Sequence, residues 1–184
     1  NVEDILMVLS GYQIKCRVYM VPLLKIQQKI MADAPNKLWV ILFRRAMIRI
    51  ASKIAEKIDA PALVSGESVG QVASQTLSNI RATADAADRP ILRPLCGMNK
   101  EDIVNLAQKI GTYEISIEPY EDCCSFFVPI HPETKANLNH VIKVESAIDF
   151  SDLFDEAMEN TIISTIQHPD YTKEELNILE EVDD

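Results

Sequence analysis

Residues 66–76 read GESVGQVASQT and directly follow a short apolar run that ends at Val64. A strand, a glycine-containing loop and a helix, in that order, form ligand sites at the edge of open α/β sheets. The stretch therefore predicts a short buried strand over 61–64, a loop over 65–71 and a helix that continues to about Asn79. This order of elements is typical of the α/β fold class.

The loop carries residue types that suit a polar or anionic ligand. A missing Cβ at Gly66 lets the backbone turn sharply and approach a ligand closely. A following helix would present free N–H groups at its N-terminus, and Gln71, Ser74 and Gln75 would add polar groups within about one turn. An ordinary capped helix, with Ser68 as the N-cap and the glycines as turn residues, explains the same letters. Both interpretations stay open at this point.

Helical and strand signals alternate on both sides of this stretch, which favours a parallel sheet covered by helices. The run 16–21 is a predicted strand ended by Pro22, and 91–95 is another, interrupted by Pro94. Asn99 and Gly111 are predicted to cap the helix between them. We therefore expect an α/β fold with a doubly wound, mostly parallel sheet. The expected helices span 2–12, 23–31, 37–58, 100–110, 134–147 and 150–159, and 113–132 is expected to be irregular.

Composition limits the classes of function. The 184 residues fit one domain, and 18 basic against 28 acidic residues give a net charge of −10. A polyanion such as RNA gains little from that sum, so RNA binding would need a local basic patch or a separate domain. No apolar run approaches the roughly 20 residues that cross a bilayer, and no signal peptide begins the sequence. We expect no membrane association.

The four cysteines, at 16, 96, 123 and 124, do not resemble a secreted disulfide framework. Adjacent Cys123 and Cys124 cannot easily bond to each other, and the absence of a CxxC pair argues against a zinc site. Reduced thiols and a cytoplasmic location are expected, with no metal site in the protein.

Four motifs, in order, give a more specific indication. They are GESVGQVASQT at 66–76, PILRPL at 90–95, IGTYEISI at 110–117 and PYEDCC at 119–124. Together they resemble the tRNA 4-thiouridine synthetase family, and the similarity extends over about 15–150. The resemblance implies an ATP pyrophosphatase fold, similar to adenine nucleotide alpha hydrolases. It also implies an enzyme that adenylates a tRNA uridine with ATP, replaces the activated oxygen with persulfide sulfur and supplies sulfur for thiamine thiazole synthesis.

The resemblance also assigns residues. It implies ATP with Mg²⁺ as the cofactor and nucleotide contacts at Arg44, Gly66 and Gln75, although Arg44 could equally form a surface salt bridge on its arginine-rich helix. It implies a redox role for one cysteine of the pair, and the register before the apolar run 126–128 favours Cys124 over Cys123. Such a cysteine must reach its partner as a thiolate, so exposure is expected; the alternative is two small core residues.

The sequence departs from the family pattern at its ends. The family's phosphate-binding SGG-x-DS loop would lie upstream of Asn1, and no RNA-binding THUMP or rhodanese-like sequence occurs here. We therefore expect an incomplete doubly wound sheet that lacks the first strand, with catalytic-domain residues over 1–170 and an acidic tail over 171–184. Alone, the 184 residues are expected to be inactive.

The expected partners are tRNA, through domains absent here, and a cysteine desulfurase or another persulfide donor. A second copy in a homodimer is a further candidate partner. Two alternatives remain: another ATP pyrophosphatase with a small-molecule substrate, and a non-catalytic interaction module.

Overall fold

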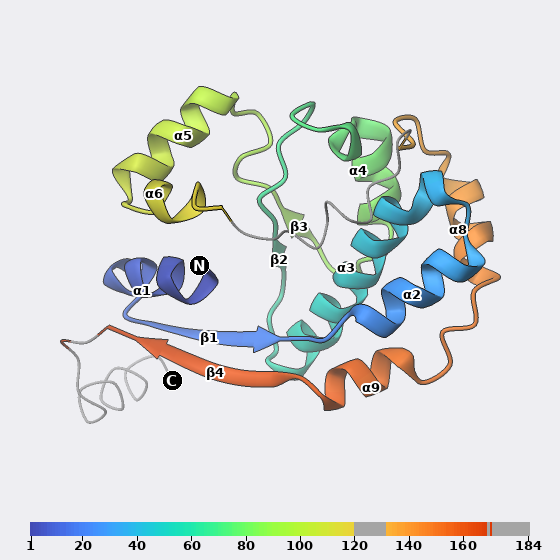
Figure 1. The fold of residues 1–184 in the computed structure, drawn as a ribbon, viewed down its shortest axis with the longest axis horizontal. Helices are drawn as coiled ribbons and strands as arrows, with labels where there is room; N and C mark the ends of the chain where they lie inside the picture. Colours follow the sequence, from blue (N-terminus) through green and yellow to red (C-terminus); the bar gives the residue numbers. More distant parts are fainter. Residues whose placement is uncertain (120–131, 169, 171–184) are drawn as a thin grey trace. The chain divides into compact units, whose positions relative to one another are not determined.

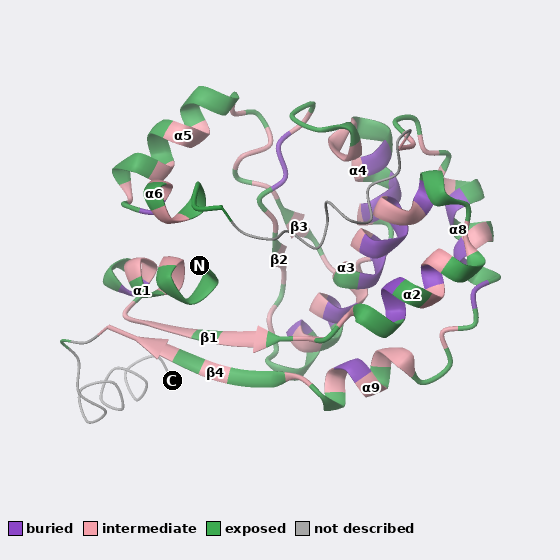
Figure 2. Cartoon of the chain, in the orientation of Figure 1, coloured by how far each residue is buried: buried purple, intermediate pink, exposed green. Residues whose placement is uncertain are grey.

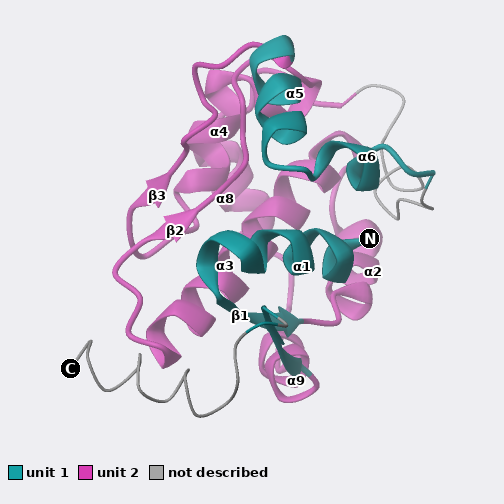
Figure 3. Ribbon diagram, turned by 90° about the vertical axis from the view of Figure 1, so that its left-hand side faces the viewer, with its two compact units in different colours: residues 1–20, 101–120, 161–184 teal, residues 21–100, 121–160 magenta. Residues whose placement is uncertain are grey.

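A computed structural model describes residues 1–119, 132–168 and 170 (Figure 1). Helices and strands alternate along much of the chain, as predicted for an α/β protein. The chain divides into two compact units, shown in Figure 3. Unit 1 comprises 1–20, 101–120 and 161–184, and unit 2 comprises 21–100 and 121–160. Within the described ranges, every helix is too short or too polar to span a membrane.

Unit 1 is organised around an antiparallel pair of strands, β1 (Lys15–Met20) and β4 (Ile162–Gln167). Lys15 lies opposite Gln167 and Met20 opposite Ile162, and the backbone N–H of His168 donates to the Ile14 carbonyl at 2.8 Å. Both strands are rich in β-branched or apolar residues, which suit a pleated surface. Helix α1 (Val2–Gln13) contacts both strands and α6 (Tyr113–Ser116).

Strand β1 confirms the prediction over 16–21 to within one residue, whereas β4 was not predicted. The pair is antiparallel, so the expectation of a mostly parallel sheet is wrong for this part of the chain. Parallel pairing was inferred from helices between successive strands, but β1 pairs with a strand that lies more than 140 residues later in the sequence. Periodicity along the chain carries no signal of such a distant partner.

Helix α5 (Lys100–Lys109) begins directly after Asn99 and ends before Gly111, as predicted. Gly111 adopts φ +80°, a left-handed conformation that glycine reaches without steric cost at the end of a helix. A Cβ at this position would also lie 3.6 Å from Cγ1 of Val8 in α1. Gly111 therefore ends α5 where the chain passes close to α1. The predicted irregular region beyond it contains the short helix α6.

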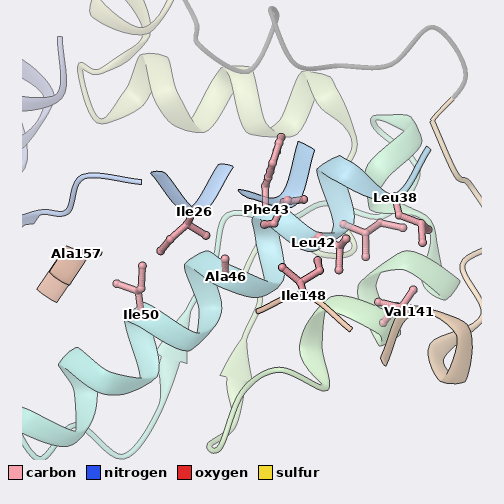
Figure 4. Close-up of a cluster of buried hydrophobic side chains, with 12 residues drawn as sticks. Ile26, Leu38, Leu42, Phe43, Ala46, Ile50, Val141, Ile148 and Ala157 are labelled. Atoms are coloured by element: carbon pink, nitrogen blue, oxygen red, sulfur yellow. The ribbon is translucent and has the colours of Figure 1, made fainter. Parts of the chain in front are cut away.

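Unit 2 holds the main hydrophobic core, which Figures 2 and 4 show centred on α3 (Trp39–Lys57). Ile41, Leu42, Ala46 and Ile50 recur at helical spacing and are almost fully buried. Ile26 contributes from α2. The other described helices of unit 2 are α2 (Leu24–Asp33), η1 (Asn36–Leu38), η2 (Ala73–Gln75), α4 (Leu77–Ala84), α8 (Leu138–Ser146) and α9 (Leu153–Glu159).

Unit 2 also contains a parallel pair of short strands, β2 (Leu63–Val64) and β3 (Ile91–Leu92). The parallel pairing is as predicted, but β3 ends before Pro94, which cannot donate a ladder hydrogen bond. The prediction that β2 is buried is wrong. Val64 is 70% exposed and Leu92 55% exposed, because the parallel sheet has only these two strands among the described residues.

Candidate functional site

The chain between β2 and α4 does not form the helix predicted from about residue 71. It runs without helix to Val72, forms the short 3₁₀ helix η2, and enters α4 only at Leu77. Thr76 is the N-cap, and its Oγ1 accepts a hydrogen bond from the backbone N–H of Asn79 at 3.2 Å. Ser68 is therefore not the N-cap. Gln71 precedes η2 and does not share a helical face with Gln75.

A buried carboxylate organises this loop. The side chain of Glu67 is 6% exposed and accepts hydrogen bonds from Nη2 of Arg44 and from Nε of Arg93 at 2.6 Å. The hydroxyl of Ser65 donates to the same carboxylate at 3.0 Å. Charged hydrogen bonds to two guanidinium groups compensate the cost of burying this carboxylate. Glu67 thus joins α3, the loop and the end of β3.

The loop is also held to itself and to α3. Nη1 of Arg44 lies 3.4 Å from the Ser74 hydroxyl, and Oε1 of Gln75 accepts the backbone N–H of Ser68 at 3.2 Å. The backbone N–H of Gly70 donates to the Gln75 carbonyl at 3.0 Å, with Gly70 at φ +79°. A non-glycine residue would be strained there. The predicted nucleotide residues Arg44 and Gln75 therefore belong to one hydrogen-bonded network.

The backbone conformation of Gly66 differs from the one predicted. Its φ does not lie in the left-handed region, and a Cβ built there meets no heavy atom within 4 Å. Neither a sharp turn nor packing among the described residues requires glycine at this position, so that part of the prediction is wrong. The space beside Gly66 leaves the backbone accessible.

Beside this network lies a cavity of about 240 Å³ between α3, β2 and β3. Its apolar walls and few polar groups are typical of small-molecule sites, although its volume is below the roughly 300 Å³ at which drug-sized pockets begin. The cavity suits one part of a ligand, such as a base or a sugar. It is lined by Arg44, Met47, Ile48, Ala51, Leu63, Val64, Ser65, Glu67 and Ile91.

The charges around Glu67 do not cancel. Arg44 and Arg93 bring two positive charges to one carboxylate, and Nη2 of Arg93 is buried with no hydrogen-bond partner in the part of the chain that the structure describes. Guanidinium donors bind phosphate and carboxylate oxygens well. The site is therefore electropositive in a chain whose net charge is −10. An anionic or strongly polar ligand group suits it.

Sequence reasoning missed Glu67 and Arg93 as members of the site. Both lie in motifs that were noted, GESVGQVASQT and PILRPL, but their separation of 26 residues follows no helical or strand period. The usable signal was an acidic residue directly after a predicted strand, near a helix that carries arginines. Such a carboxylate must find a cationic partner if it is buried.

The cysteine predictions lie mostly outside the described residues. Cys123 and Cys124 fall in the range 120–131, outside the residues that the structure describes. Cys16 and Cys96 are half-buried free thiols. In the described ranges, no group of three or more His, Cys, Asp or Glu side chains could hold a metal ion.

The chain is similar in sequence to a known protein family. The family model described as thiamine biosynthesis protein (ThiI) matches residues 1–150. A probable tRNA sulfurtransferase of Caldanaerobacter subterraneus subsp. tengcongensis is 45% identical over 162 residues, covering 88% of this chain and 43% of that protein. A probable tRNA sulfurtransferase of Acetivibrio thermocellus is 46% identical over 166 residues, covering 90% of this chain and 42% of the relative. The chain thus spans less than half the length of these relatives.

A solved structure is also similar to this chain in sequence and fold. The crystal structure of a 4-thiouridine synthetase–RNA complex with bound ATP superposes with a TM-score of 0.86 at 42% identity. The match covers 90% of this chain and 44% of that chain. It confirms the predicted α/β fold class.

Proposed function

The chain belongs to the thiamine biosynthesis protein (ThiI) family, and we propose that it forms part of the catalytic domain of a tRNA sulfurtransferase. In this proposal residues 1–170 are the major part of the ATP pyrophosphatase domain, and 171–184 form an acidic tail. The products are 4-thiouridine in tRNA and sulfur for the thiamine thiazole. The observation that carries the proposal is the electropositive network in which Arg44 and Arg93 share the Glu67 carboxylate, beside a small apolar cavity.

The first step needs a bound ATP, and the solved relative was crystallised with ATP. We assign nucleotide contacts to Arg44, Gly66 and Gln75. The cavity suits a base or sugar, Arg44 supplies a fixed cation beside it, and the open backbone at Gly66 permits close approach. Mg²⁺ would enter with the phosphate chain. The uridine 4-carbonyl oxygen attacks the α-phosphorus, and pyrophosphate leaves.

The second step transfers sulfur. The terminal sulfur of a donor persulfide attacks C4 of the activated uridine, and AMP leaves with the former carbonyl oxygen. The product of this step is a disulfide between C4 of uridine and the donor. The thiolate of Cys124 then attacks the sulfur of that disulfide that belongs to the donor. The 4-thiouridine leaves as its thiolate, and Cys124 stays joined to the donor by a disulfide. A thiol reductant reduces that disulfide and completes the cycle.

The remaining partners follow from the same proposal. The solved relative is an RNA complex, and with a net charge of −10 this chain would depend on other protein regions for most of its grip on tRNA. A cysteine desulfurase or another persulfide donor supplies the sulfur. A cytoplasmic location suits both tRNA and the persulfide donor. A homodimer is compatible with the exposed apolar side chains of β4.

The deciding experiment measures 4-thiouridine formed per enzyme over several turnovers by the complete gene product. Cys124→Ser should sharply reduce multiple-turnover thiolation while pyrophosphate release continues, because serine cannot take the oxidised sulfur. Cys96→Ser is the matched control, and Cys123→Ser should be milder than Cys124→Ser. Loss in Cys123→Ser alone would move the redox role to Cys123. No thiouridine from the wild-type protein would favour a non-catalytic module.

A further inference from the structure

We propose that Asn79 is a positioning residue that ties the nucleotide loop to the segment 133–136, which follows the cysteine pair in the sequence. The inference rests on the proposed function, because it concerns the coupling between uridine activation and sulfur transfer. Asn79 lies on α4 in unit 2 and is completely buried. Nothing in its own helix requires an amide side chain at this position.

The side chain of Asn79 bonds to two separate stretches of backbone. Its Nδ2 donates to the Ala73 carbonyl at 3.1 Å and to the Glu133 carbonyl at 2.6 Å. Its Oδ1 accepts the backbone N–H of Ala136 at 3.1 Å. The amide orientation is fixed, because the reversed group would place an oxygen against two carbonyls and an NH₂ against an N–H donor. Both donors and the acceptor are therefore committed outside α4.

One end of this connection is the nucleotide loop. Ala73 is the first residue of η2, and the next two residues contact the site: Ser74 lies beside Arg44, and Gln75 accepts from Ser68. A shift at Ala73 would displace both side chains, because three residues of a 3₁₀ helix form a single short turn.

The other end is the segment 133–136. Thr76 supports it, since its Oγ1 donates to the Thr134 carbonyl at 2.7 Å, and the backbone N–H of Glu133 donates to the Lys37 carbonyl at 3.1 Å. Cys124 precedes Glu133 by nine residues. A nine-residue connection reaches at most about 30 Å. If 133–136 were released, the connection would begin at the α8 cap, Asn137, and its reach would grow to about 44 Å.

This difference limits the size of the effect. The effective concentration of a tethered group falls roughly as the −3/2 power of tether length, so thirteen residues against nine give a loss of at most about 1.7-fold. A slower sulfur transfer leaves the activated uridine exposed to water, which returns uridine and AMP and wastes ATP. The molar ratio of pyrophosphate released to 4-thiouridine formed should therefore rise in Asn79→Ala, by at most about 1.7-fold.

The ratio separates positioning from stability. A variant that only unfolds part of the enzyme loses both products equally, so the ratio stays at the wild-type value. Thr83→Val is the matched control: Thr83 is equally buried on α4, but among the described residues its hydroxyl donates only to the Ile80 carbonyl of the same helix. It should lower stability without changing the ratio. If Asn79→Ala does not fold, Thr76→Val should raise the ratio and Thr76→Ser should restore it.

The experiment uses the complete gene product and measures pyrophosphate and 4-thiouridine in the same reaction. Amide exchange adds a direct readout, because the Ala136 N–H should exchange faster in Asn79→Ala and at the wild-type rate in Thr83→Val. An active wild-type enzyme with the same ratio in Asn79→Ala would overturn the positioning role alone. An equal rise in Thr83→Val would overturn it too. A wild-type protein that forms no thiouridine would overturn the proposed function and, with it, this coupling.

Discussion

Two neighbouring arginines of α3 bind two different buried carboxylates. Arg44 pairs with Glu67 of the loop and remains 22% exposed beside the cavity. Arg45 pairs with Glu145 of α8 at 2.7 Å and is only 2% exposed. One helical residue turns the side chain by about 100°, so adjacent positions reach opposite surroundings.

The two clusters differ in how fully their donors are used. Arg45 contacts Glu145, Asp85 and the Ala82 carbonyl. Arg49 also binds Glu145, so this cluster has two carboxylates for two guanidinium groups. The Glu67 cluster has one carboxylate for two guanidinium groups and keeps a buried donor without a described partner. A saturated cluster holds elements together, whereas an unsaturated cluster beside a cavity can still bind a ligand. Four predictions test this contrast.

The largest effect is expected from Arg45→Met. Removal of the buried guanidinium leaves the buried Glu145 with only the partly exposed Arg49 as a charged partner, which should cost about 3 kcal/mol of unfolding free energy. Urea unfolding of the 184-residue chain measures it. Lys53→Met is the control on the same helix, because its bond to Asp155 at 2.8 Å is exposed and should leave the unfolding midpoint unchanged. A loss below about 1 kcal/mol for Arg45→Met would contradict the structural role.

The second prediction concerns acid. Burial acts to raise the pKa of Glu145, but hydrogen bonds and charge from Arg45 and Arg49 outweigh it, and the pKa lies below its ordinary value of 4.5. The folded state therefore binds fewer protons at this site, and the stabilisation is complete above pH 4.5 and lost as pH falls through the lowered pKa. The difference in unfolding free energy between wild type and Glu145→Gln should shrink over that range. A difference that does not change with pH would contradict it.

An intermediate effect is expected from Glu67→Gln. Glutamine keeps the volume and one acceptor but removes the charge between Arg44 and Arg93, which should cost about 1–2 kcal/mol of stability. Arg44 is partly exposed, so water can replace some of the loss. In the complete gene product the KM for ATP should rise, because both guanidinium groups lose their shared anchor. Glu67→Asp retains the charge, so its KM for ATP should lie between those of the wild type and Glu67→Gln. An unchanged KM in both variants would remove Glu67 from the site.

The smallest stability change is expected from Arg44→Met. Glu67 keeps Arg93 and Ser65, so the loss should stay below about 1 kcal/mol, close to that of a surface ion pair. Nucleotide use should nevertheless weaken by about tenfold, the equivalent of one charged contact. Steady-state rates against ATP concentration measure this. A large stability loss with an unchanged ATP dependence would make Arg44 a structural residue like Arg45.

Local interactions explain what the sequence determined by itself. The apolar period of α3 and the left-handed Gly111 after α5 depend on residues within a few positions of one another, so each was predicted from its own stretch. The motifs around Gly66 and Cys124 indicated the family without any structural information. Local reasoning was less reliable at the start of α4: Ser68 was considered as the N-cap from its own stretch, but the folded loop places Thr76 there.

Tertiary structure alone decided the contacts between distant residues. Strand β4 forms because its backbone pairs with that of β1. The Glu67 carboxylate can be buried because Arg44 and Arg93, which are 23 and 26 residues away in the sequence, bind it. The same holds for Asn79, whose amide bonds to Glu133 and Ala136 across more than 50 residues. These contacts form only after the chain has closed large loops, and their geometry depends on packing of the whole unit rather than on sequence spacing.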